Sequence, residues 1–210
     1  MASKRVPRSS KPVRRSGKPD AKSKPAVVGL LFQLHVLLLG SQPGIWRRLV
    51  APGEVDLGML NRILQAAMGW GQAHSHEFVV GDIKYSDSTV DVEHAEARDE
   101  TGVRLCDVAP RTNDSFTYLY DNGSAFEHEI LVEKVSERGD KFPGYPVCLD
   151  GEASCPTDEC GGNGGYGSKS NALNESESDE SEELSEWATE EFDPEAFDLD
   201  EINRRLRRVK

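Results

Sequence analysis

Three of the four cysteines in the sequence lie within the stretch VCLDGEASCPTDECGG, at Cys148, Cys155 and Cys160. Thiolates are common zinc ligands, but a structural zinc site needs four ligands in a tetrahedral arrangement. The candidates for the fourth ligand are His128, His74, His76 and Cys106. Two other interpretations stay open, because these cysteines also suit reduced thiols in a glycine-rich turn or a disulfide or redox pair.

The histidines indicate a second kind of site. His74 and His76 are two residues apart in a predicted strand, so their side chains share one face, and His128 lies in another predicted strand. Three imidazoles could bind zinc and leave a position for water, as in a metal-dependent hydrolase. The glutamates beside them point to the opposite face by the same alternation, which favours the alternative of histidines hydrogen-bonded within the sheet.

A third candidate is the run Trp46-Arg47-Arg48. An indole beside two guanidinium groups could stack on and clamp a nucleobase or a carboxylate. The alternative is a strand in which the tryptophan belongs to the core and the arginines pair with surface acids.

The elements that must position these residues follow from hydrophobic periodicity. Residues 27–39 and 45–52 predict a hairpin, and alternation on either side of Asp121-Asn122-Gly123 predicts a second one. The apolar stripe from Leu57 to Met68 predicts a helix that begins at the N-cap Asp56 and ends at Gly69 or Gly71. This order predicts an α+β fold with a β-grasp-like mixed sheet, a helix packed across it and a C-terminal helical extension.

That C-terminal helix is expected after Asp198, because Leu199, Ile202 and Leu206 recur at helical spacing. The remaining organisation follows from composition. Residues 1–26 form a basic tail that we expect to be disordered, residues 27–165 form the α+β domain, and residues 166–210 form an acidic, partly helical extension. Weak helices are expected at 167–173 and 181–189.

Charge and hydropathy limit the classes of function. The chain has 210 residues and a formal net charge of −12, which argues against nucleic acid as the main ligand. Residues 1–25 nevertheless carry nine Lys or Arg and one Asp, so this arm could bind phosphates weakly. No apolar run is long enough to span a membrane, and no signal peptide is recognisable, so we expect a cytoplasmic protein with no membrane partner.

Several segments together resemble the plasmid pRiA4b open-reading-frame-three-like family, some members of which carry the label TnpR as insertion-sequence passenger proteins. The matching segments, in the family's order, are PGIWRRLVAPG, LNRILQAAMGW, HSHEF, YLYDNGSAFEHEI, YPVCLDGEASCPTDECGG and FDPEAFDLDEINRRL. The family usually has Gly-Asp-Gly-Trp where this chain has Gly123-Ser124-Ala125-Phe126, so a carboxylate and an indole are replaced.

The resemblance implies a largely uncharacterised bacterial domain, often found near mobile elements. The chain shows no phosphate-binding loop, dinucleotide fingerprint, nucleophile elbow or His-Glu-x-x-His motif. We therefore expect a non-catalytic binding or accessory module with an unidentified protein partner, associated with plasmids or transposable elements, in which zinc could stabilise the cysteine-rich loop. The alternatives are a metal-dependent hydrolase using the three histidines and a nucleic-acid-binding accessory protein using the basic arm.

Overall fold

The computed structural model describes residues 29–42, 44–71, 74–88, 96–120, 126–156, 193 and 195–209. The predicted disordered tail, the predicted helices at 167–173 and 181–189, and Cys160 lie outside these residues.

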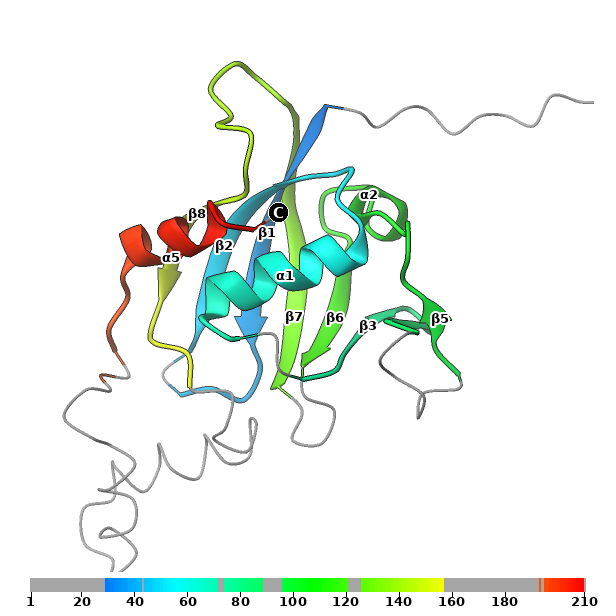
Figure 1. Ribbon diagram of the computed structural model, residues 1–210, viewed down its shortest axis with the longest axis horizontal. Helices are drawn as coiled ribbons and strands as arrows, with labels where there is room; N and C mark the ends of the chain where they lie inside the picture. Colours follow the sequence, from blue (N-terminus) through cyan, green and yellow to red (C-terminus); the bar gives the residue numbers. More distant parts are fainter. Residues whose placement is uncertain are drawn as a thin grey trace, which may run out of the picture.

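A single eight-stranded sheet organises the described chain (Figure 1). Its strands are β1 (Leu30–Leu38), β2 (Trp46–Pro52), β3 (His76–Val80), β4 (Ile83–Ser86), β5 (Arg98–Asp99), β6 (Ser115–Tyr120), β7 (Phe126–Glu137) and β8 (Val147–Glu152). They are arranged in the order β5-β4-β3-β6-β7-β1-β2-β8, and only the β4–β5 pair is parallel. The predicted α+β class and both predicted hairpins are confirmed. The β-grasp-like arrangement is not confirmed, because the sheet is larger than the element order indicated.

The central strand β1 shows why the sheet has one covered face. Its residues alternate between buried and half-buried side chains along LLFQLHVLL, so Phe32, Leu34, Val36 and Leu38 all point into the core. The same alternation in β6 and β7 places further apolar side chains on that face. Three helices, α1 (Leu57–Met68), α2 (Leu105–Val108) and α5 (Leu199–Leu206), complete the described elements.

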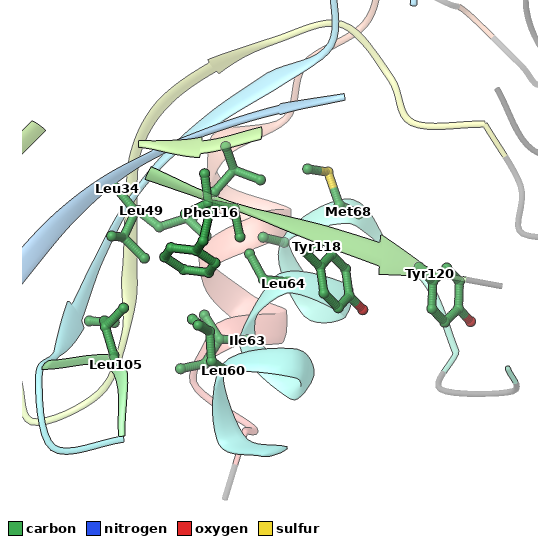
Figure 2. Close-up of a cluster of buried hydrophobic side chains, with 14 of the residues drawn as sticks. Leu34, Leu49, Leu60, Ile63, Leu64, Met68, Leu105, Phe116, Tyr118 and Tyr120 are labelled. Atoms are coloured by element: carbon green, nitrogen blue, oxygen red, sulfur yellow. The ribbon is translucent and has the colours of Figure 1, made fainter. Parts of the chain in front are cut away.

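Helix α1 forms where its sequence signals predicted it. The Asp56 carboxylate accepts a hydrogen bond from the Met59 N–H at 2.7 Å, which satisfies one of the unpaired donors of the first turn. Gly69 ends the helix in the left-handed conformation at φ 90°. Leu60, Ile63 and Leu64 face the sheet, where Figure 2 shows them beside Phe116, Tyr118 and other core side chains.

The segment between β3 and β6, for which the sequence predicted no element, contains β4, β5 and α2. These elements are two to four residues long, too short for a period of side-chain burial to appear in the sequence. Leu105 at the start of α2 is fully buried, so this short helix closes one end of the core.

The predicted C-terminal helix is present as α5, beside β8 (Figure 1). Asp198 caps it by accepting a hydrogen bond from the Glu201 N–H at 2.8 Å. Ile202 and Leu206 enter the core. The Asn203 side chain accepts a hydrogen bond from the Cys148 N–H and donates one to the Cys148 carbonyl, each at 2.9 Å, so one amide holds both backbone groups of a β8 residue.

The described helices pack against one face of the sheet, and the other face carries none of them (Figure 1). We call this second surface the open face; its side chains come from the alternate residues of β6, β7, β1, β2 and β8. No described helix is long and apolar enough to traverse a bilayer.

Candidate functional site: a pocket under the C-terminal helix

The run Trp46-Arg47-Arg48 is divided between the two faces of the sheet, because side chains alternate along β2. Arg47 is 3% exposed and points towards the helices, whereas Trp46 and Arg48 lie half-buried on the open face. The structure therefore does not form one clamp from these three residues, and each arginine belongs to a different surface.

Arg47 uses all of its N–H groups within the protein. Its Nε donates to the Ala67 carbonyl at 3.4 Å, close to the end of α1. Its two terminal nitrogens donate to the carbonyls of Trp46, Glu152 and Ala153 at 2.7–2.8 Å, and one of them lies 3.3 Å from the Cys155 Sγ. The guanidinium thus joins the end of α1 to β2 and to the chain that leaves β8.

The Arg47 guanidinium also lines a cavity of about 270 Å³. One wall is the end of α1, from Ala67 to Gly69, and the second wall is the segment from Ser154 to Pro156. The third wall is α5 with the residues that lead into it, which contribute Phe197, Asp198, Glu201, Ile202 and Arg205. The lining therefore combines an apolar floor with side chains of both charges.

The Cys155 thiol is part of this lining. Its Sγ lies 3.3 Å from Nη2 of Arg47 and 3.2 Å from Sδ of Met68. Burial raises the pKa of this thiol to about 11, although the nearby charges of Arg47 and Arg205 act in the opposite direction. At neutral pH the side chain is consequently a thiol and not a nucleophilic thiolate.

Two glycines allow the C-terminal wall to approach closely. The Phe197 ring packs against Gly151. The centroid of the same ring lies 5.2 Å from the guanidinium carbon of Arg47. The Arg205 guanidinium lies directly against Gly69, at the carbonyl end of α1. A positive charge there is favourable for the dipole of α1, which has no basic residue in its own last turn.

Substitution of Gly151 with alanine should loosen this wall. An added Cβ would lie 2.5 Å from Phe197 Cε2 and 2.7 Å from the Trp46 carbonyl oxygen, and the latter belongs to a paired strand. We expect the free energy of unfolding to fall by about 1–3 kcal/mol, as for other overpacked sites. Urea unfolding measures it, with Gly139→Ala as the control, because no atom lies within 4 Å of a Cβ there. Equal effects of the two substitutions would contradict the close contact with Phe197.

The cysteines predicted as zinc ligands have separate surroundings. Cys148 is buried on β8, its thiol lies 3.2 Å from the Asp150 carbonyl, and burial raises its pKa. Cys155 faces the pocket, and Cys160 lies outside the described residues. Within the described ranges, no group of three or more His, Cys, Asp or Glu side chains is placed to hold a metal ion. A zinc site that includes Cys160 stays a prediction.

The three histidines are not gathered around one point. The Tyr118 ring lies between two of them, with its centroid 6.2 Å from that of His76 and 5.4 Å from that of His128. His74 contacts Tyr120 instead, ring to edge, at 5.7 Å. His74 precedes β3, so it lies outside the strand that was predicted to contain it. His76 and His128 are both buried, but β6 separates β3 from β7 and fills the space between the two histidines with tyrosines.

Each buried histidine has a partner in the sheet or beside it. Nε2 of His76 donates to the Glu100 carboxylate at 2.8 Å, and both residues are buried. Nδ1 of His128 lies 3.1 Å from the Phe126 carbonyl and 3.3 Å from that of Tyr118, so this nitrogen carries the proton. Complete burial lowers the pKa of His128 to about 4. His76 and His128 therefore match the alternative of histidines hydrogen-bonded within the sheet, and not that of ligands around one metal ion.

A polar network between α1 and β6 was missed in the sequence. The Tyr118 hydroxyl donates to the Asn61 side-chain oxygen at 2.6 Å, and Nε2 of Gln65 donates to the same oxygen at 2.7 Å. Burial raises the pKa of Tyr118. The sequence contains one signal of this network. Asn61 and Gln65 are four residues apart in a largely apolar helix, and this spacing puts both side chains on one face.

On the open face, Trp46 and Arg48 form a mixed aromatic and ionic group. The indole N–H donates to the Glu152 carboxylate at 2.9 Å, and the Arg48 guanidinium lies over the indole at 5.1 Å. Arg48 also donates twice to Glu133, at 2.7 and 3.0 Å, and the Glu133 hydrogen bond raises the pKa of Arg48. The His35 ring stacks on Trp46 with centroids 5.3 Å apart.

Together, the half-covered sheet, the crossing helix and the pocket under α5 define an α+β domain with a ligand-sized hollow on the helical side of its sheet. The chain belongs to the family described as "Plasmid pRiA4b ORF-3-like protein", which it matches over residues 31–201. The matched range includes β1 from its second residue, most of the pocket lining and the first three residues of α5, and it ends before the lining residues Ile202 and Arg205.

The chain is also similar to two proteins of unknown function. The chain is 29% identical over 193 residues to the uncharacterized protein y4hQ of Sinorhizobium fredii, covering 85% of this chain and 91% of that protein. It also resembles the crystal structure of MM3350, a protein of unknown function from Methanosarcina mazei, with a TM-score of 0.70 and 28% identity. That match covers 82% of this chain and 97% of the other.

Proposed function

We propose that the chain is a non-catalytic binding module whose pocket under α5 takes a small zwitterionic ligand of amino-acid size. The observation that carries the proposal is the lining of this pocket, where Arg205 and Arg47 face the same hollow as Asp198 and Glu201. A ligand with one anionic and one cationic group would find a partner of each sign, and its apolar part would rest on Phe197 and neighbouring side chains.

The size of the pocket supports a small ligand. Pockets for drug-sized molecules are about 300–1,000 Å³, and this one is about 270 Å³. Asp198 uses Oδ1 for the helix cap, and Arg205 pairs with Glu201 through Nε at 3.1 Å. The second carboxylate oxygen of Asp198 and the terminal nitrogens of Arg205 are therefore the atoms to which we assign ligand binding.

The chemistry of the buried groups supports binding in place of catalysis. Cys155 is a neutral thiol at physiological pH because burial raises its pKa to about 11, so it is a weak nucleophile. Arg47 donates all its N–H groups to the protein, so its contribution to a ligand is positive charge and shape.

The proposal includes a cytoplasmic setting and an accessory role on plasmids or other mobile elements. Cys106, Cys148 and Cys155 are free thiols, which is usual in a reducing compartment. The plasmid setting rests on the name of the family, which refers to an open reading frame of a plasmid.

The test measures binding of the common free amino acids to the full chain by thermal shift and then by calorimetry. We expect one or a few of them to raise the melting temperature, since a ligand that binds only the folded state stabilises it. Asp198→Asn keeps a residue that caps helices well but removes the charge, and it should weaken binding roughly tenfold. Arg205→Gln should have a similar effect.

Arg204→Gln is the matched control, because Arg204 also pairs with Glu201 but does not line the pocket. An equal loss of affinity in this variant would mean that the ligand binds elsewhere. Mass spectrometry of the recovered ligand tests the absence of catalysis, and a changed mass would contradict it. If no amino acid binds, the proposed ligand class is wrong.

A further inference from the structure

The open face of the sheet carries an excess of negative charge. Five carboxylates lie there: Glu127, Glu129 and Glu133 on β7, and Asp150 and Glu152 on β8. The basic side chains on the same five strands and the same face are Arg48 and Lys134. This surface is separate from the pocket and has no bearing on the ligand proposed for it.

The acids on this face differ in how far they are already neutralised. Glu133 is held by Arg48 and accepts a further hydrogen bond from Gln33 at 2.8 Å. Glu127 and Glu129 are exposed, and no ion pair between described residues engages either one. Glu127 and Glu129, in the first half of β7, therefore keep their negative charge unpaired with respect to the described residues.

Apolar side chains lie between these acids, so the face is an unpartnered sheet surface as well as a charged one. Leu37 pairs with Trp46 on one side and with Glu129 on the other, and Leu131 pairs with His35. All four uncharged side chains in these pairs are only half-buried. Such a surface suits an occupant with basic groups and long aliphatic stems, which are the two properties of lysine and arginine.

The chain itself provides such a segment. Residues 1–25 contain nine Lys or Arg and one Asp, and they join the sheet directly, because β1 begins at Leu30. Glu129 lies opposite Leu37, about 24 Å along β1 from Leu30 at the usual rise per residue. A segment of this length can extend over roughly 80 Å, so it can reach every carboxylate on the face.

We propose that the basic N-terminal segment, residues 1–25, docks on the open face of its own sheet through Glu127, Glu129, Asp150 and Glu152. Because the segment is tethered to β1, its effective concentration at the face is on the order of millimolar, and weak contacts suffice to hold it. The contacts are mostly between exposed charges, so docking weakens as salt increases. The docked segment covers the face that any other basic partner would use. The carboxylates of the face also neutralise the lysines and arginines of the segment, which would otherwise bind phosphates.

Carbodiimide cross-linking of the full chain tests the placement, because it joins lysine amines to carboxylates in direct contact. The segment offers Lys4, Lys11, Lys18, Lys22 and Lys24. We expect peptides that join these lysines to Glu127, Glu129, Asp150 or Glu152 at low salt, and a several-fold lower yield at about 0.5 M salt. A mixture of unlabelled and ¹⁵N-labelled chains distinguishes links within one chain from links between two.

Trypsin cleavage within residues 1–25 provides a second measurement that does not need the cross-linked carboxylates. Cleavage should be several-fold slower at low salt than at high salt, and the double variant Glu127→Gln, Glu129→Gln should lose this protection. The control pair Asp82→Asn, Glu96→Gln removes the same charge from exposed sites beside β4 and β5, at the opposite end of the sheet from β8, and should keep the protection.

Three outcomes would overturn the proposal. Cross-links only to residues 175–201 would place the segment on the acidic C-terminal region. Cross-links only between labelled and unlabelled chains would make a second copy the occupant. Binding of a DNA duplex that is equally tight in the wild type and in the Glu127→Gln, Glu129→Gln variant would show that the face does not compete for the segment.

Discussion

Replacement of Arg47 with methionine is expected to lower the free energy of unfolding by about 3–5 kcal/mol, because each buried acceptor left without a donor costs about 1–3 kcal/mol. The carbonyls of Ala67 and Ala153 would each lose a donor in a buried hydrogen bond. The carbonyls of Trp46 and Glu152 would each lose one in a part-buried hydrogen bond. Methionine preserves most of the volume of the aliphatic stem, so the effect would report the lost hydrogen bonds more than a cavity.

The neighbouring residue provides the matched control for this measurement. Arg48→Met removes the same charge one position further along β2. The ion pair between Arg48 and Glu133 is partly accessible to solvent, because the two side chains are 30% and 23% exposed. Exposed pairs of this kind contribute about 1 kcal/mol or less. Chemical unfolding of the two variants should therefore separate them clearly. Similar losses would mean that the Arg47 hydrogen bonds contribute little.

Acidification from pH 6.5 to pH 4 is expected to destabilise the fold through His128 by up to about 3 kcal/mol. The pKa of His128 is about 4 in the folded protein, against an ordinary value of 6.5, because complete burial disfavours the charged imidazole. Between these values the unfolded chain binds a proton that the folded chain does not, so stability falls as pH falls. The contribution is fully present above pH 6.5 and is lost as pH approaches 4.

The measurement compares the free energy of unfolding of the wild type and of His128→Phe across this range. Carboxylate titrations are common to both proteins, so the difference between the two curves isolates the imidazole. NMR titration of the His128 ring in the wild type determines the same pKa directly and does not depend on how well the variant folds. A midpoint near 6.5, or two parallel stability curves, would contradict the effect of burial.

The features that the sequence predicted well are those encoded within a few residues of one another. Asp56, the apolar stripe and Gly69 define α1 locally, and Asp198 does the same for α5. These signals act over one turn of helix or one strand, and no information about the rest of the fold is needed to interpret them. The expectation of a core tryptophan beside arginines that pair with surface acids was right only for Arg48, which pairs with Glu133, because Trp46 lies on the open face and Arg47 is the buried residue.

The pocket could not be predicted in the same way, because its walls come from segments far apart in the chain. Arg47 meets Ala153 and Phe197 only after β2 has paired with β8 and α5 has docked. The partnership of His76 with Glu100 depends likewise on β5 and α2, which are too short to have a recognisable period. The alternation of side chains along a strand predicts the face on which each histidine lies. It does not predict that β6 lies between the strands of His76 and His128.

The amide of Asn203 has a consequence for how the protein behaves in a crowded solution. β8 ends the sheet, and the outward N–H and C=O groups of a terminal strand are a template for pairing with another chain. Asn203 occupies both groups of Cys148 with a side chain from a helix, which cannot extend the sheet further. Helix α5 therefore hinders edge-to-edge aggregation at β8. A chain that lacks α5 would expose the backbone groups of β8 to other copies of the protein.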